Sequence, residues 1–547
     1  MTATDTASLF EREIGEPRRG RREVPHIGLP DRRRWLGMAA IAVGWALWST
    51  GIGRTGIVNT RGWPLLRSFF GAVTHPELEG SFLRRIASAT LVTGAYAMLG
   101  TVLSVLVGAV GGVVMSETWW ARSLASRQRR ARPIWLAARV LSSVVRGIHE
   151  GVWGLIFVIV LGLNPLVAVL AIALPYGAIT AKVYADLIDE TGAASFRALR
   201  ATGAPRLTAL LYGVIPSTLP DLVSYAFYRL ECSMRAGVIL GMIGAGGLGF
   251  ELTQSFNSLR YNEMWTIIGA LIILSTLADQ WSARLRRRGS TRNVRATLVA
   301  AFGLTVASGW YLGVHPSTLW SSRTREQLSF LGKHGFPPRL DGHAWARLWR
   351  GAIQTVQISI LAAALAATLG LFVAMFASRE NQVGRVRTWI VAPFARTLLL
   401  LARAIPAPVW ALLVLFVVFP GIMPAAIALG LYTFGVLGRL MAEVIENLDW
   451  RPTRALRATG AGRVSVAAYA QLPLAAPKLA SLSLYRWEVA IRETILVGVV
   501  GTSGLGRILE RQRVGLDYRS MATTVIAMIV LTLGVDVISG RIRRSLG

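Results

Sequence analysis

The chain has 547 residues, of which 53% are apolar and only 16% are charged, and its formal net charge is +30. An average soluble domain carries about 25% charged residues, so this composition indicates an integral membrane protein and excludes a disordered chain. Cys232 is the only cysteine, which excludes both a disulfide scaffold and a cysteine-based zinc site.

The chain begins with a polar, arginine-rich segment, 1–34, that lacks the apolar core of a signal peptide. Stretches of about 20 apolar residues cross a bilayer, and on this criterion the remaining sequence predicts twelve membrane spans, six in each half. They lie near 35–50, 88–115, 136–163, 165–187, 217–242, 262–282, 296–314, 351–377, 388–419, 422–445, 474–499 and 519–539.

Arginine clusters precede the first span, separate the second from the third, and follow the sixth. All three fall on one side of the membrane if the N-terminus is inside, as the positive-inside rule asks. We therefore expect both termini in the cytoplasm, and we interpret the positive charge as membrane-flanking rather than nucleic-acid-binding. The outer loops near 51–87 and 315–350 also contain arginines, but there they are mixed with acidic residues.

The two halves of the chain repeat each other. The stretch Ala198–Arg206 (ALRATGAPR) recurs 257 residues later as Ala455–Arg463 (ALRATGAGR), and the same offset holds from 146 to 287. Six spans per copy give both copies the same orientation. The sequence therefore predicts two membrane halves, 35–288 and 289–547, related by a pseudo-twofold axis along the membrane normal, with the functional path between them.

The repeated ALRATG stretch lies between the fourth and fifth spans of each half, on the cytoplasmic side of the predicted topology. It is expected to form two short helices broken at Gly203 and again at Gly460. A proline follows each glycine thirteen residues later, at Pro216 and Pro473, and suits the first turn of the next helix. An ordinary basic connector would not need to keep this spacing in both copies.

A glycine followed thirteen residues later by a proline, in a cytoplasmic loop, resembles the coupling motif of ATP-binding-cassette (ABC) importer permeases. Two further stretches are similar to sequences of the phosphonate-type permease family. They are YRLECSMRAGVILGMIGAGGLGFEL and YRWEVAIRETILVGVVGTSGLGRIL. The resemblance covers both halves. Typical members supply one half per chain and dimerise, whereas this chain resembles two halves fused. It implies the all-α type I importer fold.

The resemblance also implies partners and a substrate class. Two ATPase subunits, expected to be a homodimer, would bind ATP and Mg²⁺. An extracytoplasmic solute-binding protein would deliver a small phosphorus oxyanion: phosphonate, phosphite or phosphate. The chain itself is expected to hold no cofactor, because no lysine is followed by Ser or Thr as a P-loop requires, and its scattered histidines predict no metal site.

Coupling to the ATPases would run through the repeated segments. The residues implied are Arg197, Ala198, Arg200, Gly203, Arg206, Arg454, Ala455, Arg457, Gly460 and Arg463. The family motif opens with a glutamate where this chain has Arg197 and Arg454, so the ATPase surface should be more acidic than usual.

A polar stripe runs along the fifth span of each half at helical spacing. Its members are Ser224, Tyr228, Glu231 and Arg235, repeated as Ser481, Tyr485, Glu488 and Arg492. Ionisable residues inside a membrane rarely face lipid, so we expect the arginines to attract an anionic substrate along a shared path and the glutamates to hold them. The alternative is a structural ion pair in each half. Arg229 and Arg486 lie about 200° round the helix from the glutamates and are expected to pack against another span.

Glycines follow the fifth span at Gly244, Gly247 and Gly249, and again at Gly501, Gly504 and Gly506. The first stretch also matches the dinucleotide pattern GxGxxG, through Gly244, Gly246 and Gly249, but no βαβ unit surrounds it. We expect a tight outer loop, which either offers backbone N–H groups to an anion or is a bare turn. In the third span of the second half, Pro406 and Pro408 predict a break in the helix. His149 stands at the matching position of the first half, and we favour a packing role for it.

The two alternative functions are a secondary transporter and a membrane enzyme. A twelve-span secondary transporter with parallel repeats would use an ion gradient and no ATPase, and the repeated glycine–proline segment argues against it. A membrane enzyme would need a clustered acid, base and nucleophile, and the sequence offers none.

Overall fold

The computed structural model describes residues 32–50, 56, 58–120, 131–191, 193–287, 291–339, 341–378 and 387–546. The chain divides into two units, 1–42 and 43–547, and the second contains most of the described residues. Most of the predicted cytoplasmic segment 1–34 lies outside the described residues, as do Arg127, Arg129 and Arg130, so the topology that was argued from these arginines stays a prediction.

The described residues form helices, apart from one isolated antiparallel bridge between Val58 and Val418. The α-helices are α2 (Arg32–Ser49), α3 (Trp63–Gly71), α4 (Gly80–Met115), α6 (Ala131–Gly147), α7 (Glu150–Leu161), α8 (Pro165–Thr191), α9 (Ala193–Ala201), α10 (Arg206–Ala209), α11 (Ile215–Leu240), α12 (Leu248–Asn257), α13 (Tyr261–Arg287), α14 (Thr291–Tyr311), α15 (Ser322–Gly335), α16 (Gly342–Ala377), α17 (Ala392–Ala404), α18 (Ala407–Val417), α19 (Ile422–Glu446), α20 (Arg451–Ala458), α21 (Arg463–Val466), α22 (Leu472–Val499), α23 (Leu505–Val514) and α24 (Tyr518–Leu546).

Short irregular turns join several of these helices. Three are 3₁₀ turns, at Thr60–Gly62, Ala72–Thr74 and Pro316–Trp320. Four are π-helical turns, at Leu210–Val214, Gly241–Ala245, Arg387–Val391 and Ala467–Gln471. The turns before α11 and α22 lie at repeated positions, so both copies enter the fifth span in the same way.

Seven helices in the described part of the chain are long and apolar enough to cross a membrane, and the number rises to nine if each of two bent pairs is one span. The seven are Gly80–Met115, Pro165–Thr191, Arg206–Ala245, Tyr261–Ala278, Gly342–Ala377, Ile422–Glu446 and Tyr518–Arg543. Nine of the twelve predicted spans correspond to these elements, and twelve as a total stays a prediction.

The other three predicted spans differ from the nine for physical reasons. The apolar helices Gly37–Ser49 and Ala296–Tyr311 are short. Helix α22 is long enough, but it carries Lys478, Arg486, Glu488, Arg492 and Glu493, and this charge keeps it from reading as an apolar span.

Helix α4 packs along α8, and at the repeated positions α16 packs along α19. Glycines permit the close approach: a Cβ at Gly108 would lie 2.5 Å from the Thr180 Cγ2 atom. Contacts across the halves are reciprocal, since α13 touches α17 and the equivalent α24 touches α6. A twofold relation produces such reciprocity.

The third span of each half is sharply bent. The axes of α6 and α7 meet at 88°, and those of α17 and α18 meet at 94°. The break predicted at Pro406 is confirmed, and Pro406 caps the start of α18. The first half bends without a proline, because the His149 ring accepts a hydrogen bond from Gly151 N and caps α7.

Candidate functional site

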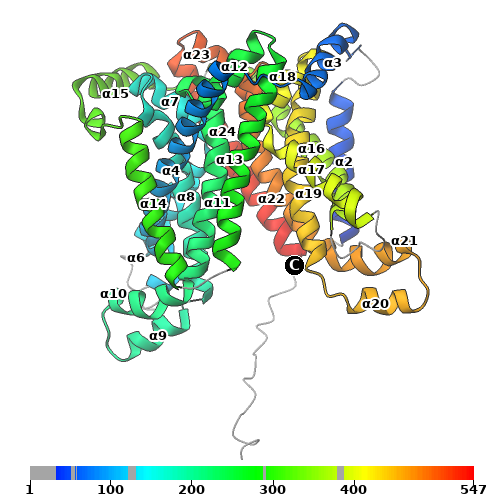
Figure 1. The fold of residues 1–547 in the computed structure, drawn as a ribbon. Helices are drawn as coiled ribbons and strands as arrows, with labels where there is room; N and C mark the ends of the chain where they lie inside the picture. The colour runs from blue at the N-terminus through cyan, green and yellow to red at the C-terminus, as the bar shows by residue number, and fades with distance from the viewer. Residues whose placement is uncertain are drawn as a thin grey trace, which may run out of the picture. The chain divides into compact units, whose positions relative to one another are not determined.

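The repeated ALRATG stretches form two matching helical elbows. Helices α9 and α10 make one elbow, and α20 and α21 make the other, at the end of the bundle where α24 finishes (Figure 1). Pro216 and Pro473 lie in the first turns of α11 and α22. The predicted local structure, two short helices followed by a proline-started span, is confirmed in both copies.

Gly203 and Gly460 are the turning points of these elbows. Their φ angles are +89° and +80°, in the left-handed region that favours glycine, and a Cβ at either would meet open space. The Arg200 guanidinium donates to Ala204 O and closes the first turn. The backbone conformation, rather than crowding, therefore requires glycine at both sites.

Most coupling residues named from the sequence face outward. Arg197, Ala198, Arg454 and Ala455 are exposed, whereas Arg200, Arg206 and Arg457 are half-buried. The side chain of Arg463 is not among those that the structure describes. The exposed arginines give the elbows a basic surface, and the rings of Tyr212 and Tyr469, also at repeated positions, project from it.

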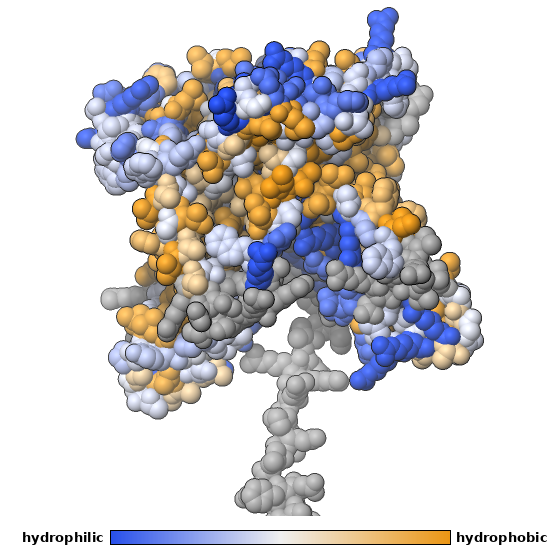
Figure 2. All heavy atoms as spheres, viewed as in Figure 1, coloured by the Kyte–Doolittle hydropathy of each residue, from blue (hydrophilic) through white to orange (hydrophobic). Residues whose placement is uncertain are grey.

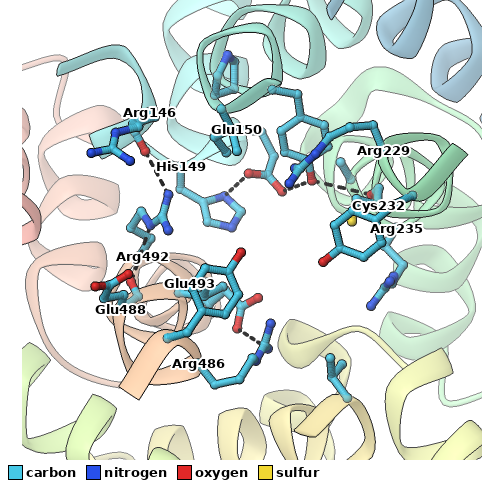
Figure 3. Close-up of a pocket in the computed structure, with 18 of the residues that line it drawn as sticks. Arg146, His149, Glu150, Arg229, Cys232, Arg235, Arg486, Glu488, Arg492 and Glu493 are labelled. Atoms are coloured by element: carbon cyan, nitrogen blue, oxygen red, sulfur yellow. Dashed lines mark hydrogen bonds and ion pairs between the residues drawn. The ribbon is translucent and has the colours of Figure 1, made fainter. Parts of the chain in front are cut away.

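Between the halves lies a cavity of about 720 Å³, called here the central cavity. Figure 2 shows hydrophilic residues around the hollow between the two elbows. Its wall is strongly charged, with basic and acidic side chains from both halves (Figure 3). The basic members are Arg146, Lys182, Arg229, Arg235, Arg403, Arg439, Arg486, Arg492 and Arg543, and the acidic members are Glu150, Asp186, Glu231, Glu443, Glu488, Glu493 and Asp536.

Six of the eight residues of the predicted polar stripes line the central cavity. They are Tyr228, Glu231 and Arg235 on α11, and Tyr485, Glu488 and Arg492 on α22. Ser224 and Ser481 are half-buried and are not among the lining residues. Helical spacing alone thus selected the cavity-facing side of both helices.

Glu231 joins the two halves. Its Oε1 atom lies 2.8 Å from Arg235 Nη2 and 2.9 Å from Arg403 Nη1, and Arg403 belongs to α17 of the other copy. Arg235 Nη1 also donates to the Tyr432 hydroxyl at 3.3 Å. The expected pairing of Glu231 with Arg235 is confirmed, and Arg403 is a partner that the sequence analysis did not name.

The ion pairs of the second copy differ from those of the first. Glu488 Oε1 pairs with Arg543 Nη2 at 2.7 Å rather than with the Arg492 side chain. Arg492 instead donates from Nη1 to Arg146 O at 3.0 Å, and Arg146 Nη2 lies 3.4 Å from Asp536 Oδ2. The expectation that Glu488 holds the Arg492 side chain is wrong, because Arg543 at the end of α24 takes the carboxylate.

Arg229 and Arg486 also line the central cavity, which the sequence analysis did not expect. Successive residues advance about 100°, so each lies far from its glutamate but only about 20° from the cavity residue seven positions later. The cavity-facing arc of these helices is therefore wide. Arg229 does pack on a neighbouring span, with its guanidinium carbon 5.2 Å from the ring centre of Tyr176 on α8.

A cluster without a counterpart in the second half surrounds Glu150. The Glu150 carboxylate accepts from the Tyr176 hydroxyl at 3.1 Å, and its other oxygen lies 3.2 Å from His149 Nδ1. The packing role favoured for His149 is confirmed by its burial, since the residue is only 7% exposed, and its ring also caps α7 through the bond to Gly151 N. Across the described ranges, no group of three or more potential ligands is placed to hold a metal ion.

A second cavity of about 600 Å³ lies toward the end of the bundle where α12 and α23 sit, and it is called here the outer cavity. Ile239 and Leu496 line both cavities, and they occupy repeated positions. Leu155 and Leu412, also repeated, line the outer cavity. Ile239 and Leu496 thus form an apolar layer, one residue from each half, that both cavities share.

The glycine loops pack tightly at this end. Gly244, Gly247, Gly501 and Gly504 have φ angles of +107°, +74°, +110° and +89°, and a Cβ at Gly249 or Gly506 would collide with a backbone carbonyl. The N–H groups that open α12 and α23 are already bonded: Leu248 N donates to Thr93 Oγ1 and Leu505 N donates to Thr355 Oγ1. This supports the bare-turn interpretation rather than an anion site.

An acid–base pair on α23 borders the outer cavity. Arg513 Nη2 and Nε donate to the two oxygens of Glu510 at 2.6 and 2.8 Å. These hydrogen bonds are the largest cause that raises the pKa of Arg513. The attraction of the Glu510 charge also raises it. The repeated positions in the first half hold Thr253 and Phe256, so this pair belongs to one side only.

Two transport permeases are similar in sequence to the chain. The phosphate-import permease protein PhnE of Mycolicibacterium smegmatis is 29% identical over 475 residues, which cover 84% of this chain and 86% of that protein. The phosphite transport system permease protein PtxC of Stutzerimonas stutzeri is 32% identical over 261 residues, which cover 46% of this chain and 89% of that protein. PtxC thus corresponds to about one half.

The family model for the inner membrane component of binding-protein-dependent transport systems matches the chain twice, at residues 108–290 and 366–547. The two matches end 257 residues apart, the same offset as the repeat that the sequence shows. They also support the ABC importer interpretation against the ion-coupled transporter. The chain belongs to this family, and it is a multi-pass inner membrane permease subunit of an ABC importer, with the permease domain duplicated in one polypeptide.

Proposed function

We propose that the chain forms the translocation path for a small phosphorus oxyanion, such as phosphonate, phosphite or phosphate. The observation that carries this proposal is the central cavity, where nine Arg and Lys side chains face seven Asp and Glu side chains within the membrane-spanning bundle. Charged groups are costly there, and an excess of arginine suits oxyanions. The similarity to permeases named for phosphate and phosphite import supports the substrate class.

The two elbows couple this path to separate ATPases. In this proposal the elbow end is cytoplasmic, both termini lie on that side, and two ATPase subunits with bound ATP and Mg²⁺ dock on the basic surfaces around Arg197 and Arg454. A solute-binding protein delivers the anion at the opposite end. The halves 35–288 and 289–547 then make up a type I importer fold of twelve spans about a pseudo-twofold axis.

The layer of Ile239 and Leu496 is the gate in this scheme. The central cavity, on the elbow side, corresponds to the inward-open state, and the outer cavity shares these two lining side chains with it. ATP binding would draw the elbows together, part the apolar layer and open the path outward. Hydrolysis would return it to the inward-open state.

Proteoliposomes that contain the chain, its ATPase subunits and its binding protein test the proposed function. We expect ATP-dependent uptake of at least one of phosphate, phosphite and methylphosphonate, with little uptake of sulfate or of a neutral amino acid. ATP-dependent uptake of an uncharged solute, with none of the three phosphorus oxyanions carried, would refute the proposed substrate class.

A further inference from the structure

The two copies of one arginine have different surroundings. Arg229 on α11 and Arg486 on α22 occupy repeated positions, and both line the central cavity (Figure 3). In Arg229, Nε and Nη2 both donate to the Tyr225 hydroxyl, at 2.9 and 2.6 Å. The edge of the guanidinium formed by these two nitrogens is therefore occupied.

The same edge is open in Arg486. Leu482 stands where the first half has Tyr225, and neither Nε nor Nη2 of Arg486 has a hydrogen-bond partner among the described residues. The side chain is only 8% exposed, so bulk water does not satisfy it. A buried donor without a partner is costly, so the two nitrogens on this edge hold hydrogen-bonding capacity that the protein does not use.

One acidic group stands beside this edge. Glu493 Oε2 lies 3.6 Å from Arg486 Nη2, beyond hydrogen-bond distance, and it too lacks a hydrogen-bond partner. Glu493 is 12% exposed and lines the cavity, and the repeated position in the first half is Ala236. In the second half, this ion pair therefore leaves two donors and one acceptor without a hydrogen bond.

We infer that Arg486 and Glu493 form the oxyanion-binding subsite of the central cavity. The Nε–Nη2 edge of an arginine binds two oxygens of an oxyanion in a bidentate manner. The free Glu493 oxygen accepts the hydrogen of an anion that keeps a proton. This inference rests on the proposed function, and it places the substrate on one side of the path rather than on the pseudo-twofold axis.

The subsite gives a physical basis for selectivity. Phosphate, phosphite and phosphonates retain an acidic proton over part of the range near neutral pH, since a phosphoryl group has a second pKa of about 6. Sulfate carries no such proton, so its oxygens would face the Glu493 carboxylate with like charge. The subsite should therefore accept protonated oxyanions and reject fully ionised ones.

The test is equilibrium binding of radiolabelled phosphate and radiolabelled sulfate to the purified complex of the full chain with its ATPase subunits, without the binding protein. Arg486→Gln should weaken phosphate binding by about tenfold or more, because it removes charge-assisted hydrogen bonds. The matched Arg229→Gln should weaken phosphate binding less than Arg486→Gln does and should also lower the unfolding temperature, since both nitrogens of that edge in Arg229 already bond to Tyr225. Glu493→Gln should reduce the preference for phosphate over sulfate.

The outcomes separate the two proposals. If the wild-type complex binds none of phosphate, phosphite and methylphosphonate, the proposed substrate class fails and the subsite falls with it. If the wild type binds phosphate but Arg486→Gln binds it equally well, only the subsite is overturned. An unchanged phosphate-to-sulfate ratio in Glu493→Gln overturns the role of the carboxylate.

Arg486→Lys covers a failure of the glutamine variant to assemble. It keeps the charge but replaces the two-donor edge by a single ammonium. We expect an assembled complex with weaker phosphate binding. Wild-type phosphate affinity in this variant would overturn the bidentate subsite.

Discussion

The two halves of the chain agree at the elbows and differ in the central cavity. At the elbows, glycine, backbone conformation and following proline are the same in both copies. In the cavity, Glu231 reaches across to Arg403 while Glu488 stays with Arg543, and Arg229 is occupied while Arg486 is open. In the proposed scheme two ATPases need two equal docking sites, whereas one substrate needs only one binding site.

The largest expected effect is at the elbows. Gly203→Val or Gly460→Val forces a β-branched residue into the left-handed region, so either change alone should abolish ATP-driven uptake while the protein still reaches the membrane. Uptake by proteoliposomes and ATP hydrolysis by the same complex measure the coupling.

Gly313→Val is the matched control for the elbow variants. Gly313 also has a positive φ, +60°, with open space around it, but it follows α14 at the opposite end. It should cause similar strain without uncoupling. Full coupled transport in the Gly203→Val, Gly460→Val double variant would refute the coupling assignment.

Next in size is the contrast between Glu231 and Glu488. Glu231→Gln leaves Arg235 and Arg403 without their carboxylate, with side chains only 18% and 11% exposed, and should destabilise the complex by roughly 2–4 kcal/mol. Glu488→Gln frees the more exposed Arg543 to meet water and should cost about 1 kcal/mol. Thermal unfolding of the purified complexes compares them, and equal losses would contradict the unequal wiring.

The stripe arginines come third. Arg235→Gln and Arg492→Gln should each slow anion uptake by about tenfold, the loss of one hydrogen bond to a charged group, with smaller effects on assembly. Normal uptake in the variants would make the stripe structural only.

The smallest effect is expected at the serines that do not line the cavity. Ser224→Ala and Ser481→Ala should change stability by less than about 0.5 kcal/mol and leave uptake within about twofold. A large loss of uptake in either variant would show that the path extends beyond the central cavity. Initial uptake rates at saturating ATP measure this.

Local chemistry made part of the account predictable from the sequence. The elbows follow from Gly203, Gly460 and the prolines thirteen residues later, and the cavity-facing residues follow from helical spacing. The partners of Glu231 and Glu488 could not be predicted, because they depend on how α17 and α24 pack against α11 and α22. The repeat did hold a signal for Arg403, which matches Arg146.

Two other features needed the structure. The bend in the first half comes from the His149 cap of α7, and the sequence there has no proline to indicate a break. A narrow polar face would leave Arg486 outside the cavity, yet the arc of α22 that lines the cavity is wide enough to include both Glu488 and Arg486. The Nε–Nη2 edge of Arg486 lacks a hydrogen-bond partner because Leu482 replaces Tyr225. The sequence repeat shows this replacement, but it does not show what the replacement does.

The most direct test of the central claim is the energy source of uptake through this chain. Vesicles that contain the chain with its ATPase subunits and binding protein should accumulate the oxyanion only when ATP is supplied on the elbow side, and a proton or sodium gradient should not replace ATP. Accumulation by the chain alone, driven by such a gradient, would contradict the account.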